Sequence, residues 1–151
     1  MKVTSRGELA LKAVLEMAKA EARGESGLSG AEIARRCQAS VKFLEQVLTQ
    51  LRVAGFIVST RGRLGGYRLA QDADEVFVGQ IHRLVDGPLA PAPCASVSQH
   101  RPCDWCANEA ECELKEMWTK VRDAIADVMD TTSLGDLLRQ TALRPADRYA
   151  I

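Results

Sequence analysis

Apolar side chains recur at intervals of three and four residues along the first third of the chain. This spacing predicts three helices, over residues 5–22, 30–36 and 41–53, each with one face toward a core. Ser29, followed three residues later by Glu32, matches a capping box at the start of the second helix. Two short helices joined by a tight turn form the pattern of a helix-turn-helix.

After the third helix, the helical spacing of apolar residues ends and shorter segments follow. Residues 56–60 and 67–70 are expected to be strands, joined by a glycine-rich turn over residues 61–66. Two strands around a glycine-containing loop predict a β-hairpin. A short amphipathic helix is expected over residues 78–86. This order of elements predicts a winged helix-turn-helix domain over residues 1–86.

The second half of the chain combines a loop with a long helix. Residues 87–108 contain four prolines and are expected to be loop. A helix from about residue 108 to 130 has a single apolar stripe that needs a partner, and a short helix completes the segment 109–138. Residues 139–151 are expected to be a flexible tail. The predicted fold class is mainly α with a small β-hairpin, and the long helix is expected to pair with its twin in a homodimer.

The composition is that of an ordinary globular domain, with 46% hydrophobic and 26% charged residues. No apolar run approaches the roughly 18 residues that span a membrane, and the N-terminus leads into no signal-peptide core. These features predict a cytoplasmic protein with no membrane partner. The sequence has no constellation of His, Asp and Ser and no paired carboxylates of the kind that catalysis uses, so an enzyme is not expected.

The formal net charge of zero is the sum of a positively charged first half and a negatively charged second half. Residues 1–70 contain 12 Lys and Arg against 6 Asp and Glu, whereas residues 71–151 contain 8 against 14. Within residues 41–70 there are 5 basic residues and 1 acidic residue. Such a local excess of positive charge is typical of a segment that contacts phosphates. The charge distribution therefore favours an operator DNA duplex as the partner of the N-terminal half.

The residues expected to contact DNA lie on the second helix of the pair and on the hairpin. They are Ser40, Lys42, Phe43, Glu45 and Gln46 on the helix, and Arg61, Arg63, Gly65 and Tyr67 on the hairpin. Lys42 can reach phosphate, Glu45 can accept from a cytosine amino group, and Gln46 can pair with adenine. The arginines of the hairpin tip suit a minor groove. The alternative is a scaffold that binds protein, with Glu45 paired to an arginine, Gln46 solvated and Phe43 in the core.

Four cysteines fall within nineteen residues of the second half. They are Cys94, Cys103, Cys106 and Cys112. Nothing suggests secretion, so a metal or redox site is favoured over a disulfide framework. Four thiolates could hold zinc or an iron–sulfur cluster, and a metal would order this loop. The alternatives are thiols that form transient disulfides, or cysteines without a role; His100 could be a further ligand or an exposed side chain.

These segments together resemble a known family, the iron–sulfur cluster regulators of the IscR/NsrR type. The resemblance is carried by residues 1–7 at the start of the chain, by Phe43-Leu44-Glu45-Gln46 with Leu51-Arg52 and Gly55, and by Arg61-Gly62 with Gly65-Gly66-Tyr67. The cysteine-rich, cluster-binding loop over residues 87–108, called the cysteine loop, and residues 132–137 complete it. It covers about residues 1–138. The resemblance implies a dimeric winged-helix transcription factor with a [4Fe–4S] or [2Fe–2S] cluster.

The resemblance also implies that three cysteines and a variable fourth ligand hold the cluster. Cys94 and Cys112 look like the first and last cysteines, and the middle one could be Cys103 or Cys106. Lys115 stands where the iron–sulfur biogenesis regulators have a histidine ligand, which makes the histidine-ligated form unexpected here. Glu8 matches the place of an acidic ligand that the nitric-oxide-sensing branch takes from the partner subunit, but it could equally be an N-terminal helix charge. The extra cysteine could instead complete an all-cysteine site.

The function expected from the sequence is a dimeric DNA-binding transcriptional regulator whose operator binding depends on an iron–sulfur cluster. Loss of or damage to the cluster by iron shortage, oxidants or nitric oxide would change the spacing of the two recognition helices. The alternative is a winged-helix regulator with structural zinc or a cysteine thiol switch in place of the cluster.

Overall fold

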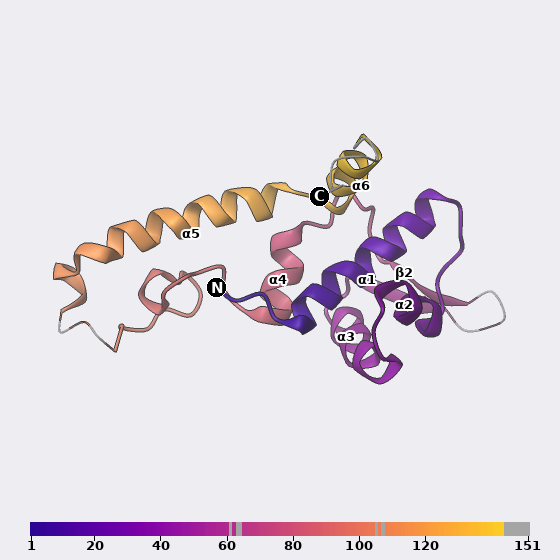
Figure 1. The fold of residues 1–151 in the computed structure, drawn as a ribbon, viewed down its shortest axis with the longest axis horizontal. Helices are drawn as coiled ribbons and strands as arrows, with labels where there is room; N and C mark the ends of the chain where they lie inside the picture. The colour runs from indigo at the N-terminus through magenta and orange to yellow at the C-terminus, as the bar shows by residue number, and fades with distance from the viewer. Residues whose placement is uncertain (61, 63–64, 105, 107, 144–151) are drawn as a thin grey trace, which may run out of the picture.

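The computed structural model describes residues 1–60, 62, 65–104, 106 and 108–143, and shows six α-helices and one hairpin in this part of the chain (Figure 1). The helices are α1 (Ser5–Ala22), α2 (Gly30–Cys37), α3 (Val41–Val53), α4 (Val78–Asp86), α5 (Glu113–Thr131) and α6 (Leu134–Ala142), and the strands are β1 (Ile57–Thr60) and β2 (Gly66–Leu69). The predicted fold class, mainly α with a winged helix-turn-helix, is confirmed. None of the described helices is long and apolar enough to cross a membrane.

Serine and threonine side chains begin the first three helices. The hydroxyls of Thr4, Ser29 and Ser40 accept hydrogen bonds from the backbone N–H groups three residues further on. The predicted capping box of α2 is only half formed, because the Glu32 carboxylate binds Arg35 and Arg36 instead of returning to the cap. The serine alone is therefore enough to fix where α2 begins.

The core lies around α1, which contacts α2, α3, α4, α6 and β2. Its largest fully buried apolar side chains are Met17, Val14, Ile33, Leu44, Val47, Leu48, Leu51, Ile57, Leu69, Ile81 and Leu134. They come from both ends of the chain, because α6 lies against α1 although the two are separated by more than a hundred residues (Figure 1). The C-terminal helix therefore completes the core of the N-terminal domain.

The hairpin is attached to the helical body at its base. β1 and β2 pair antiparallel, with Ile57 opposite Leu69 and Thr60 opposite Gly66. The Leu69 N–H donates to the Glu21 carboxylate at 2.9 Å, and a Cβ at Gly66 would lie 2.6 Å from the Leu28 carbonyl oxygen. A residue larger than glycine would therefore push the hairpin away from the start of α2.

α5 extends away from this body, and the cysteine loop runs beneath it (Figure 1). α4 packs against α5, and none of the residues of α5 is buried. The predicted helix start near residue 108 is wrong, because Asn108 caps a 3-10 turn at Glu109–Glu111 and α5 begins only at Glu113. The loop thus runs to residue 112 and contains a second 3-10 turn at Pro93–Ala95.

The C-terminal helix is longer than the sequence predicts. α6 continues to Ala142, so residues 139–142 are helical and do not belong to a tail. Its start is fixed by a complete capping box, in which Ser133 and Asp136 each accept from the other's backbone N–H. The rest of the predicted tail, from residue 144, lies outside the described residues.

Candidate DNA-binding surface and cysteine site

The second helix of the helix-turn-helix presents a polar face to solvent. Lys42, Glu45 and Gln46 are exposed on α3, while Leu44, Val47 and Leu48 of the same helix are buried. Ser40 is the N-cap, and its hydroxyl accepts from the Phe43 N–H at 3.3 Å. Because α3 is anchored by its apolar face, its opposite face can enter a major groove without disturbing the core.

Phe43 and Tyr67 are only partly available to DNA. Both side chains are half-buried and pack against the hydrophobic core. The backbone of Tyr67 exchanges hydrogen bonds of 3.0 and 2.8 Å with Leu28, and the Gly65 N–H donates to the Gly62 carbonyl oxygen at 2.9 Å. These contacts shape the base of the wing. Arg61 and Arg63, predicted to contact DNA from its tip, lie outside the described residues.

A contact from α1 reaches the exposed face of α3. The Arg6 guanidinium donates through Nη2 to Oε1 of Gln46 at 3.1 Å, and both side chains are exposed. The helical period of the sequence places Arg6 on a solvent-facing position of α1 but says nothing of its neighbour on α3. Arg6 is therefore a candidate functional residue that no local pattern of the sequence indicates.

The four loop cysteines line one hollow at the start of α5. Cys94, Cys103, Cys106 and Cys112 share this space of about 550 Å³ with polar and apolar neighbours that include Trp118. Cys94 is buried and the other three thiols are half-buried. Within the described residues, no three His, Cys, Asp or Glu side chains are spaced to hold a single metal ion. The structure thus brings the predicted cysteines together without gathering them around one point.

Two of these thiols are in direct contact. Cys106 Sγ donates to Cys112 Sγ at 3.4 Å. The hydrogen bond to Cys112 raises the pKa of Cys106 to about 12. The same hydrogen bond, together with backbone N–H groups of Leu114 and Lys115, lowers the pKa of Cys112. Cys112 therefore becomes a thiolate, the form that binds metals and attacks oxidants, before its neighbour does.

Three polar side chains connect the cysteine loop to the start of α5. The Glu109 carboxylate lies 2.9 Å from His100 Nε2 and 2.7 Å from Lys115 Nζ, and these contacts hold the pKa of Glu109 below its usual value. The sequence makes His100 a possible metal ligand, but in the structure its Nε2 contacts the Glu109 carboxylate. Lys115 links the start of α5 to the same carboxylate. These three side chains form the loop brace.

Glu8 lies outside the cysteine hollow of its own chain. On α1 it pairs with Lys12 at 2.8 Å, and more than half of each side chain is exposed. Such an exposed pair contributes little to stability and is easily exchanged. Within one chain, Glu8 is therefore an exposed, paired carboxylate that does not reach the cysteines.

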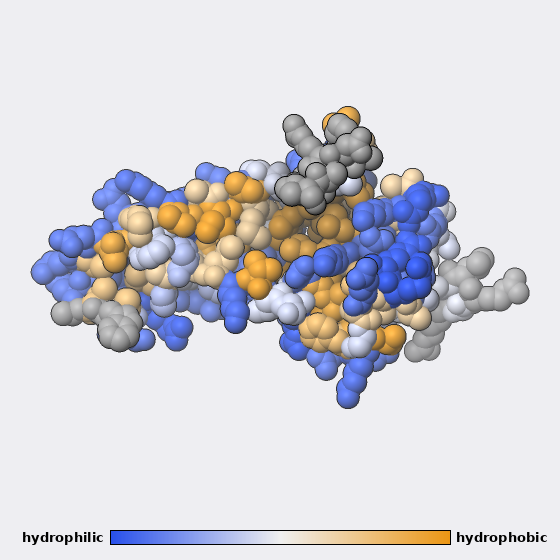
Figure 2. All heavy atoms as spheres, in the orientation of Figure 1, coloured by the Kyte–Doolittle hydropathy of each residue, from blue (hydrophilic) through white to orange (hydrophobic). Residues whose placement is uncertain are grey.

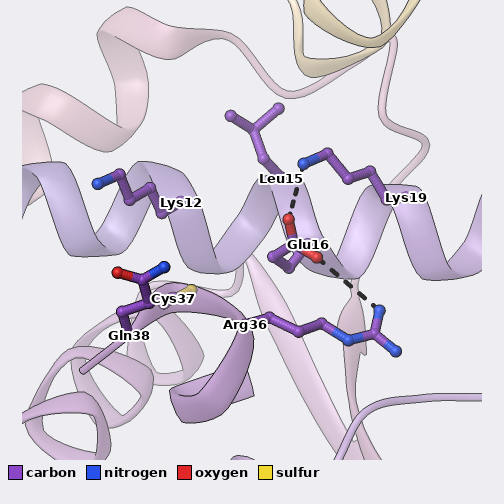
Figure 3. Close-up of a pocket in the computed structure, with 7 residues that line it drawn as sticks. All are labelled: Lys12, Leu15, Glu16, Lys19, Arg36, Cys37 and Gln38. Carbon is purple, nitrogen blue, oxygen red and sulfur yellow. Dashed lines mark hydrogen bonds and ion pairs between the residues drawn. The ribbon is translucent and has the colours of Figure 1, made fainter. Parts of the chain in front are cut away.

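A small pocket between α1 and the end of α2 contains the fifth cysteine (Figure 3). Lys12, Glu16 and Lys19 of α1 face Cys37 across this space of about 300 Å³. Burial raises the pKa of the Cys37 thiol, and Glu16, which pairs with Lys19 and Arg36, acts in the same direction. Cys37 is half-buried, takes no part in the cysteine hollow and stays protonated at neutral pH.

A buried carboxylate joins the last residue of α4 to the first turn of α1. The Asp86 side chain is 1% exposed and accepts from the N–H of Thr4 at 3.0 Å and from its hydroxyl at 2.5 Å. A Cβ at Gly7 would lie 1.9 Å from the Asp86 carboxylate, so this position requires glycine. His82 is also 1% exposed, lies 3.6 Å from the carboxylate and has no hydrogen-bond partner at either ring nitrogen among the residues that the structure describes. Burial lowers the pKa of His82, against the opposing effect of Asp86.

Comparison with known proteins places this arrangement in a family. The Rrf2 family, described as iron-dependent transcriptional regulators, matches residues 3–140. An rrf2-like HTH-type transcriptional regulator of Rhodobacter capsulatus is 41% identical over 138 residues, which cover 90% of this chain and 91% of that protein.

Two solved structures share the fold. CymR, the global cysteine regulator of B. subtilis, is 32% identical with a TM-score of 0.75, over 93% of this chain and 98% of that one. IscR of T. potens is 29% identical with a TM-score of 0.71, over 96% and 93% of the two chains. These relatives are named as regulators and not as enzymes, in agreement with the resemblance found in the sequence. The chain belongs to the Rrf2 family of winged helix-turn-helix, DNA-binding transcriptional regulators.

Proposed function

We propose that this protein is a homodimeric regulator whose binding to operator DNA is controlled by an iron–sulfur cluster of the [4Fe–4S] or [2Fe–2S] type. The observation that carries the proposal is the single hollow lined by Cys94, Cys103, Cys106 and Cys112. Soft sulfur donors are the ligands that such clusters take. The similarity to T. potens IscR and the family's description as iron-dependent support it.

The ligands we propose are Cys94 and Cys112, with Cys103 or Cys106 between them. Glu8 from the second copy is the candidate fourth ligand, and the extra cysteine is the alternative. Zinc remains the alternative metal, but a structural zinc ion needs four donors around one point. The described residues offer no group of three such donors in place, so neither metal has its ligands assembled, and analysis of iron, sulfide and zinc distinguishes the two.

The second copy would pair with α5. Leu114, Met117 and Val128 on this helix are 56%, 41% and 66% exposed, and apolar side chains gather along α5 on the face in view (Figure 2). An apolar stripe left open to solvent marks an interaction surface. Pairing of two copies would also supply two recognition helices for the two half-sites of an operator.

Residues of the chain itself would connect the cysteine hollow to the DNA-binding surface. When bound, the cluster would supply bonds to the cysteine sulfurs that form or break with iron supply, oxidants or nitric oxide. The cysteine loop starts directly after Asp86, which holds Thr4 at the first turn of α1. A displacement of the loop would therefore reach the start of α1, which contacts α3 through Arg6. The two states would differ in how the recognition helices are placed.

Anaerobic purification tests the cofactor. We expect iron and acid-labile sulfide in the native protein, and Cys94→Ala or Cys112→Ala should abolish the visible absorption. Cys37→Ala is the matched control, since this thiol lies outside the hollow and should leave the spectrum unchanged. A colourless protein that contains one zinc per chain, with neither iron nor sulfide, would rule the cluster out.

Operator binding tests the DNA surface. Arg61→Ala should weaken binding to every sequence, because an arginine at the wing would contact the minor groove. Glu45→Ala should relax base preference more than it lowers affinity. If both variants bind the operator as the native protein does, the assignment of recognition helix and wing is wrong.

A thiol switch is the second candidate, and the contact between Cys106 and Cys112 favours it. Two thiols 3.4 Å apart need a small movement to reach the 2.05 Å of a disulfide. In this reaction hydrogen peroxide takes two electrons and two protons from the thiols, giving one disulfide and two waters. Mass spectrometry of peroxide-treated, metal-free protein should show the loss of two hydrogen atoms, and Cys106→Ser should prevent it. Peptide mapping that finds both thiols free would exclude this candidate.

A further inference from the structure

The pair formed by Arg6 and Gln46 joins the first turn of α1 to the exposed face of the recognition helix. Arg6 Nη2 lies 3.1 Å from Gln46 Oε1, and forty residues separate the two positions. A guanidinium carries only hydrogen-bond donors. The atom of the glutamine amide that faces Arg6 must therefore be the oxygen, because the amide nitrogen would place donor against donor.

This polarity determines which group Gln46 offers to a base. A bidentate contact with adenine needs the amide oxygen to accept from N6–H while the nitrogen donates to N7. The amide oxygen has two lone pairs, so with Arg6 in place it would have to accept from N6–H with the second one, in an orientation that the guanidinium sets. Guanine presents two acceptors, N7 and O6, in the major groove and needs only the amide N–H groups.

We propose that Arg6 is a positioning residue that fixes the Gln46 amide as a hydrogen-bond donor, so that the recognition helix reads guanine at this position instead of adenine. The adenine contact expected from the sequence is thereby replaced. Glu45, exposed beside it, offers only acceptors and suits the cytosine amino group. The two neighbouring side chains together match a half-site rich in G·C pairs.

The hydrogen bond between Arg6 and Gln46 is exposed in the free protein, so it contributes little to folding. Its effect increases when DNA excludes water from the interface, because hydrogen bonds strengthen in a drier environment. Substitutions of Arg6 should therefore change which bases are preferred while the thermal stability stays the same.

The inference rests on the proposed function, since it requires Gln46 to face a base. The experiment is selection from a randomised operator library with the full-length protein, at matched iron and sulfide content. Gln46→Ala identifies the base-pair position that Gln46 reads, as the one where the preference disappears. At that position we expect the native protein to select guanine.

Arg6→Met removes both the charge and the donors, which frees the amide to rotate. We expect the preference for guanine over adenine to fall by about tenfold, the factor that one well-placed base contact typically provides. Arg6→Lys keeps a donor-only cation and should retain guanine. Lys2→Met, which removes another exposed charge of the N-terminal segment and leaves the pair intact, should keep the native preference.

Two results would overturn the inference in distinguishable ways. If Arg6→Met weakens binding to all sequences equally and the guanine preference stays, Arg6 contacts phosphate and does not orient Gln46. If Gln46→Ala changes no position, Gln46 does not read a base, and the proposed DNA surface fails with it. The double variant should behave as Gln46→Ala alone, because Arg6 acts through Gln46.

Discussion

The helix-turn-helix body and the cysteine loop with α5 are held together by different interactions. In the body, capped helices bury a continuous apolar core around α1. In the second region, α5 has no buried residue, and the loop buries a few side chains of its own outside that core, among them Leu89 and Ala95. The loop is also held by the loop brace and by the contact between the Cys106 and Cys112 thiols. The first region therefore rests on a continuous apolar core, whereas the second also depends on polar groups that a ligand, an oxidant or a second copy can replace.

The sharpest test of this contrast is a core substitution in the recognition helix. Leu48→Ala should lower the free energy of unfolding by about 2–5 kcal/mol, since it removes a fully buried side chain and leaves a cavity. Val97→Ala in the cysteine loop is the control, because this side chain is 81% exposed and should change stability by less than about 0.5 kcal/mol. Urea unfolding measures both. Equal losses would show that the two regions are stabilised alike.

A smaller effect is expected where the two regions meet. Asp86→Asn replaces an acceptor-only carboxylate that receives two hydrogen bonds from Thr4. The change should cost about 1–3 kcal/mol of unfolding free energy, since a buried group loses a partner. Asp123→Asn, at an exposed position on α5, is the matched control. A variant as stable as the native protein would show that Asp86 does not tie the regions together.

His82 makes this junction sensitive to pH. Because burial lowers its pKa below the ordinary 6.5, the unfolded chain binds a proton that the folded chain does not. Stability should therefore be highest above pH 6.5 and fall as the pH drops below it, by at most about 1.4 kcal/mol per pH unit. Unfolding of the native protein and of His82→Phe between pH 5 and 8 compares the slopes. If the stability of His82→Phe changes with pH as steeply as that of the native protein, other groups cause the pH dependence.

The smallest effect on stability is expected in the loop brace. Glu109→Gln removes the charge that holds His100 and Lys115. Because the contacts are exposed ion pairs, unfolding should hardly change, but the loop thiols of metal-free protein should react several-fold faster with a thiol reagent. Glu116→Gln, which breaks an exposed pair with Lys120, is the control. Equal reaction rates in the two variants would mean that the brace does not close the loop.

The same contrast explains what the sequence could predict. The bounds of α1 and α3 follow from apolar period and caps, which are local signals. The shared hollow of the cysteines was anticipated from their spacing, although the start of α5 was misplaced because Asn108 caps a short turn instead. The contacts between Asp86 and Thr4 and between Arg6 and Gln46 join positions 82 and 40 residues apart. No periodic pattern encodes such pairs, because each depends on how whole helices are packed.

The burial of Leu134 against the N-terminal domain has a consequence for protein synthesis. Leu134 is fully buried, and its N–H donates to the Val76 carbonyl oxygen at 2.9 Å. The nascent chain leaves the ribosome with its N-terminus first. The helix-turn-helix therefore emerges early but lacks this part of its core until α6 follows. The nascent chain cannot finish its DNA-binding domain before the cysteine loop has been translated. A chain that reaches DNA with this core complete therefore already contains the cysteine loop.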